Sequence, residues 1–392
     1  MDTLSLYSFD PASMSQKRMP SLRILYAALV VSLGGSFHFG YQLAITNPAQ
    51  KAFLTFLNDT WGHHMHLSSN GLSNIWSFTV AVMFLGALAG SFSISFVADY
   101  VGRKRGLFIS IGLGIISAAL SCLAFFVKSF VVYIISRITM GYSISLSLSL
   151  AAVFLSEASP CECRGLVGMI TGCTVQLGTV VGSIIAMPQI FGTSSLWYLI
   201  YVIELIIMIV FYCFLPFLPE SAGHLTKIGA YVAAKNSIKY YHNCDDDQAE
   251  IFLAEVKEEQ KESSKNYKIV NVLKNKSLRG RVLTGAVVAF GMSFSGIAVI
   301  NAYAVQILSD TGLTTTAASL ANAGISFVSL VASSISSLGV DRFVFLYYRL
   351  PETKNRTPDE VVQAIEKLPK FCTRRSIDED ETTKNETDNT NV

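Results

Sequence analysis

Two amide side chains stand inside long apolar stretches of the sequence, where polar groups are rare. Gln42 follows Phe39 by three residues, and Gln176 precedes Thr179 by three. A carboxamide offers two N–H donors and a carbonyl acceptor, which match the hydroxyl groups of a polyol. The rings of Phe39 and Trp76 could cover the apolar side of such a molecule. These residues predict a site for a hydroxyl-rich solute. For Gln176, an interhelical hydrogen bond is the alternative.

A second group of residues that could do chemistry is charged and stands between apolar stretches. Asp99 precedes Arg103 and Lys104, and Glu157 precedes Arg164 across the break Ser159-Pro160. Opposite charges at helix ends can form ion pairs that break and re-form as helices rock, so the pattern predicts a gate. The alternative is a set of cations that only anchors the orientation of the chain.

Arg137 is the one cation well inside an apolar stretch. A buried charge of this kind is costly and needs a partner, so we expect Arg137 to tie its helix to polar groups in the same bundle. His38 could titrate near neutral pH, with a packed, hydrogen-bonded histidine as the alternative.

These side chains must be positioned by membrane-spanning helices. Residues of the AVILMFWYC set make up 51% of the 392 residues and charged residues 15%, against roughly 25% charged residues in soluble domains. A helix needs ~20 apolar residues to cross a bilayer. Eight runs qualify: 22–45, 72–97, 106–127, 130–155, 165–187, 196–218, 282–308 and 316–339.

The distribution of basic residues predicts how these helices are oriented. With the N-terminus in the cytosol, 27 of the 30 Lys and Arg residues face inward and only Lys51 and Lys128 face outward. This asymmetry is the one that membrane insertion favours, and it places both termini in the cytosol. The sequon that begins at Asn58 then lies in an outer loop, 46–71, where glycosylation is expected.

The runs divide the chain into five parts. We expect a cytosolic N-terminus (1–21), a six-helix bundle (22–218), a cytosolic linker with short helices (219–281), a truncated second bundle (282–350) and a cytosolic tail with a disordered end (351–392).

Several function classes are disfavoured. The net charge of +2 offers no overall basic field for nucleic acid. The sequence has no Walker loop, nucleophile elbow, catalytic triad or dinucleotide fingerprint, so we expect neither catalysis nor a cofactor. His63, His64 and His66 cluster in the outer loop, but we interpret them as solvated rather than as metal ligands.

Short phrases at fixed places resemble the facilitative glucose transporters, which are sugar porters of the major facilitator superfamily. The phrases are Phe39-Gly40-Tyr41-Gln42, Asn58-Asp59-Thr60-Trp61, Asp99 to Lys104, Glu157-Ala158-Ser159-Pro160, Pro219-Glu220-Ser221 and Pro351-Glu352-Thr353.

The resemblance implies an all-α integral membrane fold of the major facilitator type, with a complete N-terminal six-helix bundle and two helices of the second bundle. It implies facilitative uniport of a hexose or related sugar by alternating access, at the plasma membrane. It also adds Glu220 to the gating residues. Proton-coupled members carry Asp where Gln42 stands, so the resemblance favours passive transport.

The sequence departs from the family pattern where the family binds sugar. The expected glutamine after Arg164 falls at Gly172, and Gln176 lies one turn further on. In the seventh run both family glutamines are replaced, by Met292 and Ser293. Asn301 lies one turn beyond the family's asparagine position and could substitute for it.

The two ends of the second bundle resemble segments that are far apart in the family. Val340-Asp341-Arg342 resembles the loop after span eight, and Leu350-Pro351-Glu352 resembles the segment after span twelve. The resemblance therefore implies that spans nine to twelve are missing. Two interpretations stay open: a transporter of sugar, or a transport-inactive truncated isoform that associates with full-length transporter.

Overall fold

The computed structural model describes residues 20–61, 69–160, 163–263 and 276–349, and these ranges contain helices and turns but no strand. Seven segments among them are long and apolar enough to cross a membrane. They are Leu22–Ile45, Gly71–Val101, Arg103–Val127, Phe130–Ala158, Arg164–Ile185, Tyr198–Phe217 and Thr315–Ser336. The expected all-α membrane fold is confirmed.

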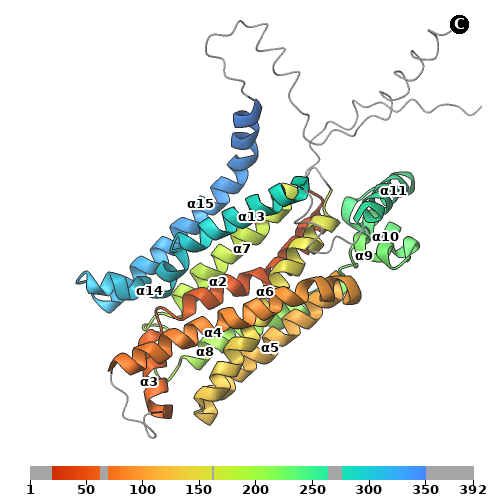
Figure 1. Ribbon diagram of the computed structural model, residues 1–392. Helices are drawn as coiled ribbons and strands as arrows, with labels where there is room; N and C mark the ends of the chain where they lie inside the picture. The colour runs from red at the N-terminus through yellow and green to blue at the C-terminus, as the bar shows by residue number, and fades with distance from the viewer. Residues whose placement is uncertain (1–19, 62–68, 161–162, 264–275, 350–392) are drawn as a thin grey trace, which may run out of the picture. The chain divides into compact units, whose positions relative to one another are not determined.

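The helices follow the chain in a simple order (Figure 1). The first half contains α1 (Leu22–Gly34), α2 (Ser36–Ile45), α3 (Gln50–Trp61), α4 (Ser69–Phe96), a π-helical turn η2 (Val97–Val101), α5 (Arg103–Val127), α6 (Phe130–Ala158), α7 (Arg164–Ile185), α8 (Tyr198–Phe214) and a 3₁₀ turn η3 (Leu215–Phe217). The second half contains α9 (Ala222–Lys227), α10 (Tyr231–His242), α11 (Asp246–Ser263), α13 (Lys276–Phe294), α14 (Ile297–Asp310) and α15 (Thr315–Arg349).

The expectation of a continuous span over 282–308 is wrong. Helix α13 ends at Phe294, and α14 begins at Ile297 after Gly296, whose φ is +76°. A left-handed residue interrupts the helical hydrogen-bond ladder, and glycine adopts this conformation at little cost. Neither piece alone is long and apolar enough to count as a span.

The segment 46–71, which we expected to form an outer loop, contains a helix that sequence analysis did not predict. In α3, Phe53 and Leu57 are four residues apart and are both buried. This spacing places them on one helix face. The Phe53 ring stacks on Trp76 at a centroid distance of 5.3 Å and meets Trp197 at 5.1 Å. An aromatic cluster therefore fastens α3 onto the ends of α4 and α8.

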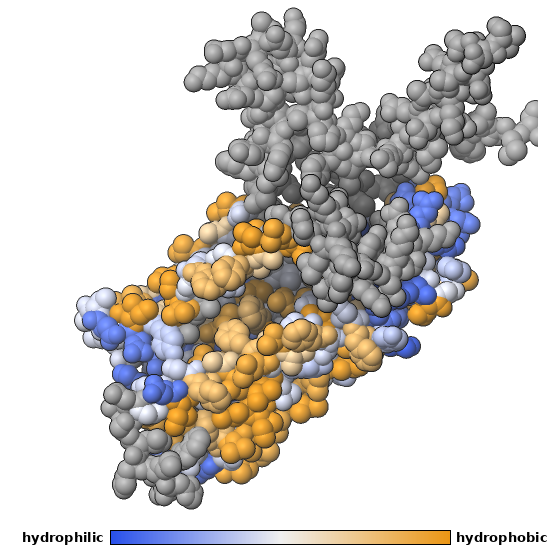
Figure 2. Space-filling model, viewed as in Figure 1, coloured by the Kyte–Doolittle hydropathy of each residue, from blue (hydrophilic) through white to orange (hydrophobic). Residues whose placement is uncertain are grey.

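The outer surface of the spanning helices is apolar. Figure 2 shows hydrophobic residues gathered along the helical bundle, whereas hydrophilic residues lie at its two ends, on the short helices α9 to α11 at one end and near α3 and α14 at the other. Large side chains such as those of Phe92, Phe126 and Val131 are mostly exposed. Such a surface is costly in water and favourable in lipid.

The three short helices α9, α10 and α11 form a small unit with its own core of Ala222, Ala234, Ile238, Ala249 and Leu253. Two hydrogen bonds of Tyr241 are among the contacts that hold this unit to the bundle. The Ser21 hydroxyl donates to the Tyr241 carbonyl at 2.8 Å, and the Tyr241 hydroxyl donates to the Pro219 carbonyl at 2.8 Å.

Candidate functional site

The buried centre of the first bundle holds a chain of polar side chains from three helices. The Gln42 amide on α2 donates to Glu204 Oε2 on α8 at 2.6 Å. Arg137 on α6 donates to Gln42 Oε1. All three residues are at most 1% exposed. A carboxamide therefore joins a buried cation to a buried anion, so that neither charge is left without a counter-charge.

Glu204 is the partner that sequence analysis missed. We expected Arg137 to be tied to polar groups of its own bundle, and the structure places Gln42 and Glu204 beside it. The available signal was a single carboxylate within the apolar run 196–218, because an acid at membrane depth usually marks a functional site.

His38 completes this cluster. Its Nδ1 lies 3.4 Å from Glu204 Oε1, and the ring is fully buried. Within the described residues, neither ring nitrogen makes a hydrogen bond. A protonated His38 would form an ion pair with Glu204, whereas a neutral ring leaves the cluster electrically balanced between Arg137 and Glu204.

The two residues of α2 that we expected to contact substrate make contacts within the protein instead. Gln42 uses its amide on Arg137 and Glu204, as described above. Phe39 is half-buried and packs against the cluster of Met140, Ile144 and Met208. The structure thus directs both side chains into the bundle.

Helix α7 presents an open face and a packed face. Side chains added at Gly168 and Gly172 would meet nothing within 4 Å. Gln176 is one further turn along this face and is half-buried. Thr179 instead faces α2, because a Cβ at Gly40 would lie 2.8 Å from its Oγ1. The structure therefore separates these two expected contacts.

The end of α2 is bonded to α14. Asn47 Nδ2 donates to the Asn301 carbonyl at 3.1 Å, and Asn47 Oδ1 accepts from the Val305 N–H at 3.0 Å. The two backbone groups belong to one helical turn. Asn301 thus takes part through its backbone, and Asn47 joins the two halves of the described chain.

A cleft of about 390 Å³ lies next to this junction, between α3, α4 and α14. Ser77 and Tyr303 share a hydrogen bond of 3.1 Å within it. Its other lining residues are Gln50, Ser73, Trp76, Gln306, Ile307 and Asp310. Amides, a carboxylate and aromatic rings together suit a hydroxyl-rich solute. Trp76 contributes only an edge, because it is 4% exposed and stacked on Phe53.

The charged residues at the opposite end of the bundle form a network that differs from the expected pairs. Arg103 Nη2 donates to Glu157 Oε1 at 2.7 Å and Nε at 3.1 Å. Glu157 Oε2 accepts from the Ser221 hydroxyl at 2.6 Å. Arg164 is exposed and has no ion pair within the described ranges. The expected pairing of Glu157 with Arg164 is therefore wrong, since Arg103 takes that place.

Asp99, Lys104 and Glu220 have their own partners in this network. Asp99 pairs with Lys227 at 2.8 Å rather than with Arg103 or Lys104. Glu220 Oε1 accepts from the backbone N–H of Lys104 at 2.8 Å, and Lys104 Nζ donates to the Pro216 carbonyl at 2.8 Å. These contacts join the start of α5 to η3 and α9.

His224 stands beside the Arg103 guanidinium, 3.4 Å from Nη1. Burial lowers the pKa of His224, and Arg103 and Lys227 lower it further, while Glu220 and Glu157 raise it. The direction is downward overall, so the ring is neutral at pH 7 and can take part in the network without adding charge.

Two further expectations concern the outer loop. Asn58 is exposed and lies within α3 rather than in a loop. His63, His64 and His66 lie outside the described residues. Among the residues that are described, no three His, Cys, Asp or Glu side chains are placed to hold a metal ion.

Comparisons with known proteins agree with the fold. The family model described as "Sugar (and other) transporter" matches residues 27–345. Facilitated glucose transporter member 7 of human solute carrier family 2 is 28% identical over 324 residues, which are 81% of this chain and 63% of that protein. Member 4 from mouse is 26% identical over 81% of this chain and 64% of that protein. The chain therefore spans less than two thirds of the length of these relatives.

Solved structures show the same architecture. The proton:xylose symporter XylE bound to 6-bromo-6-deoxy-D-glucose superposes with a TM-score of 0.72 at 21% identity, over 85% of this chain and 71% of that one. A partially occluded inward-open conformation of XylE from E. coli superposes with a TM-score of 0.67. The fold is of the major facilitator type.

Proposed function

Because the chain belongs to the sugar (and other) transporter family, we propose that it carries a hexose or related sugar across a membrane by alternating access. The observation that supports this most directly is the cleft between α3, α4 and α14, which combines Gln50, Gln306, Asp310 and Tyr303 at the junction of the two halves. The matching relatives are named as transporters, and no chemical step is proposed.

The transport mode that we propose is passive uniport. Gln42 cannot titrate, and the buried Arg137 and Glu204 already balance each other through it. The cluster is already neutral. It therefore does not need to bind a proton before the helices move. His38 is the competing feature, since its protonation would add one charge beside Glu204.

Two sets of contacts would open in alternation. At one end, Asn47 holds α14, and Ser77 bonds to Tyr303. At the other end, Arg103, Glu157, Ser221 and Lys104 join α5, α6 and the segment after α8. Charged and amide contacts of this kind are released and re-formed at modest cost when helices rock. Gln176, on the open face of α7, is the proposed sugar contact.

We propose that both termini lie in the cytosol and that the chain acts at the plasma membrane, with Asn58 glycosylated on the outer side. The positive-inside distribution of Lys and Arg supports this orientation. Surface biotinylation together with a glycosidase-sensitive shift that Asn58→Gln abolishes would test it.

Uptake of radiolabelled hexose by the full chain in a transporter-null cell tests the function. We expect saturable uptake that is lost in Gln176→Leu and does not vary between pH 6.0 and 7.5. Absence of uptake by a surface-exposed chain would overturn autonomous transport. A steep rise at low pH that Glu204→Gln removes would overturn uniport and favour proton coupling.

We propose as a second candidate function that the chain associates with a full-length transporter instead of transporting by itself. The chain spans 63% and 64% of the relatives described above. Co-expression with a full-length relative distinguishes the two. Co-purification of both chains, together with reduced uptake by the full-length protein and none by this chain alone, would favour the second candidate.

A further inference from the structure

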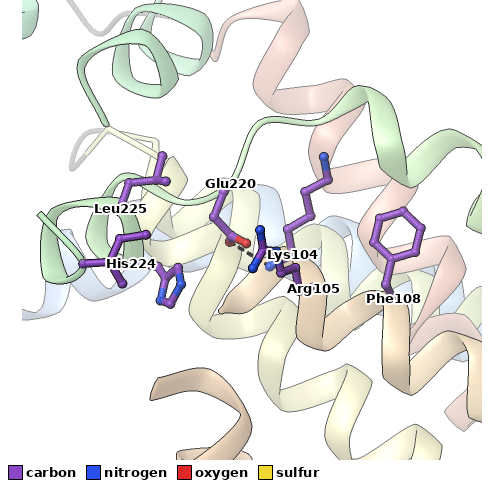
Figure 3. A pocket seen from close by; sticks show the side chains of 7 residues that line it. Lys104, Arg105, Phe108, Glu220, His224 and Leu225 are labelled. Atoms are coloured by element: carbon purple, nitrogen blue, oxygen red, sulfur yellow. Dashed lines mark hydrogen bonds between the residues drawn. The ribbon is translucent and has the colours of Figure 1, made fainter. Parts of the chain in front are cut away.

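A cavity of about 370 Å³ lies where α5 begins, outside the cleft and the buried polar cluster described above. Its polar wall is formed by Lys104, Arg105, Glu220 and His224, and apolar side chains flank this wall, with Leu225 on one side and Phe108 on the other (Figure 3). Since α5 is a membrane-crossing helix that starts at Arg103, the cavity lies at the boundary between the membrane and water.

The polar wall carries two cations against one carboxylate. Arg105 is exposed and makes no hydrogen bond or ion pair within the described residues. Lys104 Nζ donates one of its three N–H groups to the Pro216 carbonyl, at 2.8 Å, and the other two remain available to a ligand. Glu220 Oε1 accepts from the backbone N–H groups of Lys104 and Ser221, at 2.8 Å and 3.1 Å, and the carboxylate makes no ion pair with Arg105 within the described residues. The wall has an excess of free positive charge.

The apolar flanks are formed by Phe108, Leu225 and Ile228. Phe108 packs edge-on against Tyr212 at a centroid distance of 5.1 Å, which fixes its ring. Ile228 is 60% exposed, and nearby Phe217 in η3 is 70% exposed. Exposed large apolar side chains next to a spanning helix are stabilised by contact with acyl chains.

The geometry points to this cavity as a binding site for the headgroup of an anionic phospholipid, with its phosphate between Lys104 and Arg105 and its acyl chains against the flanking residues Phe108 and Ile228. Basic pockets at the ends of membrane helices attract acidic headgroups. A free phosphate could bind the two cations, but it would gain nothing from the apolar flanks. The combination of cations and apolar flanks at the membrane boundary therefore selects lipid.

Binding to the full chain, purified in a non-ionic detergent, tests this inference independently of transport. The probes are dioctanoyl phosphatidylserine, dioctanoyl phosphatidylcholine, glycerophosphoserine and inorganic phosphate, each titrated by calorimetry. We expect phosphatidylserine to bind and Arg105→Gln to weaken it about 5-fold, which matches the ~1 kcal/mol per basic residue near an acidic leaflet.

Two further variants make the test specific. Arg23→Gln removes another exposed cation, at the start of α1 over the Tyr240 ring, and should leave the affinity unchanged. Ile228→Asn should weaken the binding of phosphatidylserine and leave the affinity for glycerophosphoserine unchanged.

The contrary outcomes are distinct. Equal affinity for phosphatidylserine and phosphatidylcholine, or equal losses in Arg105→Gln and Arg23→Gln, would overturn the site. Glycerophosphoserine or inorganic phosphate binding as tightly as phosphatidylserine would show a site for a free anion and overturn the assignment to lipid. Because Arg105 and Ile228 are exposed side chains, unfolding of both variants is not expected, and thermal denaturation checks it.

Discussion

The Gln42 carboxamide donates to the Glu204 carboxylate at 2.6 Å, across a sequence separation of 162 residues, deep within the first bundle. The same carboxamide accepts from Arg137. One neutral side chain therefore separates two opposite charges that would otherwise be buried without a hydrogen-bonded partner. Replacing Gln42 with an apolar residue would remove the hydrogen bonds that this carboxamide makes to both buried charges.

Gln42→Leu should destabilise the protein by about 3 kcal/mol, because breaking a buried charged network leaves uncompensated charges. Gln176→Leu is the matched control, since it removes the same group from the open face of α7 and should cost no more than ~0.5 kcal/mol. Thermal unfolding in detergent measures both. Equal stability of the two variants would contradict the role of Gln42 as the link.

Arg103 and Glu157 should behave as one unit. Arg103→Gln and Glu157→Gln should each destabilise the protein, and the double variant should lose less than their sum, with a coupling of ~1–3 kcal/mol. The reason is the short contact of 2.7 Å on the poorly exposed Arg103 side chain. Arg164→Gln, which removes an exposed cation, should lie within ~0.5 kcal/mol of the parent. If the losses of stability in the two single variants simply add in the double variant, Arg103 and Glu157 are not energetically coupled.

His242 should make the unit of α9 to α11 sensitive to acid. Burial, opposed by a hydrogen bond with the Ala158 backbone and assisted by the charge of Arg164, lowers the pKa of His242 to about 4. The unfolded chain binds the proton near pH 6.5, so the stability due to the neutral ring is complete above about pH 6.5 and is lost as the pH falls toward 4.

The expected loss is about 3 kcal/mol between pH 7 and pH 4. His242→Phe, which keeps the ring contact with Phe252, should flatten this part of the stability profile. The measurement is hydrogen exchange of α10 at several pH values. A profile that is equally steep in the variant would assign the acid sensitivity to other groups.

Asn47 should hold the junction with α14 closed. Asn47→Ala removes the hydrogen bonds to the Asn301 carbonyl and the Val305 N–H. Each is worth ~1 kcal/mol, so the loss of both should raise the population of the open junction by roughly 30-fold. In a Ser77→Cys background, a membrane-impermeant thiol reagent should then label the cysteine correspondingly faster. Thr55→Ala is a control on α3, since Thr55 bonds only to its own helix, and it should not change the rate.

The sequence by itself determined where the apolar helices lie along the chain. The apolar runs predict all seven segments that could span a membrane within the described residues. Six of these lie before residue 218, and the seventh lies within the long helix α15. Residue type also identified the chemistry, because Gln42, Arg137 and the charges at residues 99–104 and 157–164 are unusual at their positions. These signals are local: hydropathy and helical periodicity depend only on neighbours in the chain.

The tertiary structure decided which of these residues meet. Glu157 bonds to Arg103, 54 residues away, rather than to the nearby Arg164, and Gln42 bonds to Glu204 rather than facing a solute. The break at Gly296 divided a run that appeared continuous in hydropathy. Partners across helices depend on the rotation and depth of each helix, which packing between helices sets and no local pattern in the sequence encodes.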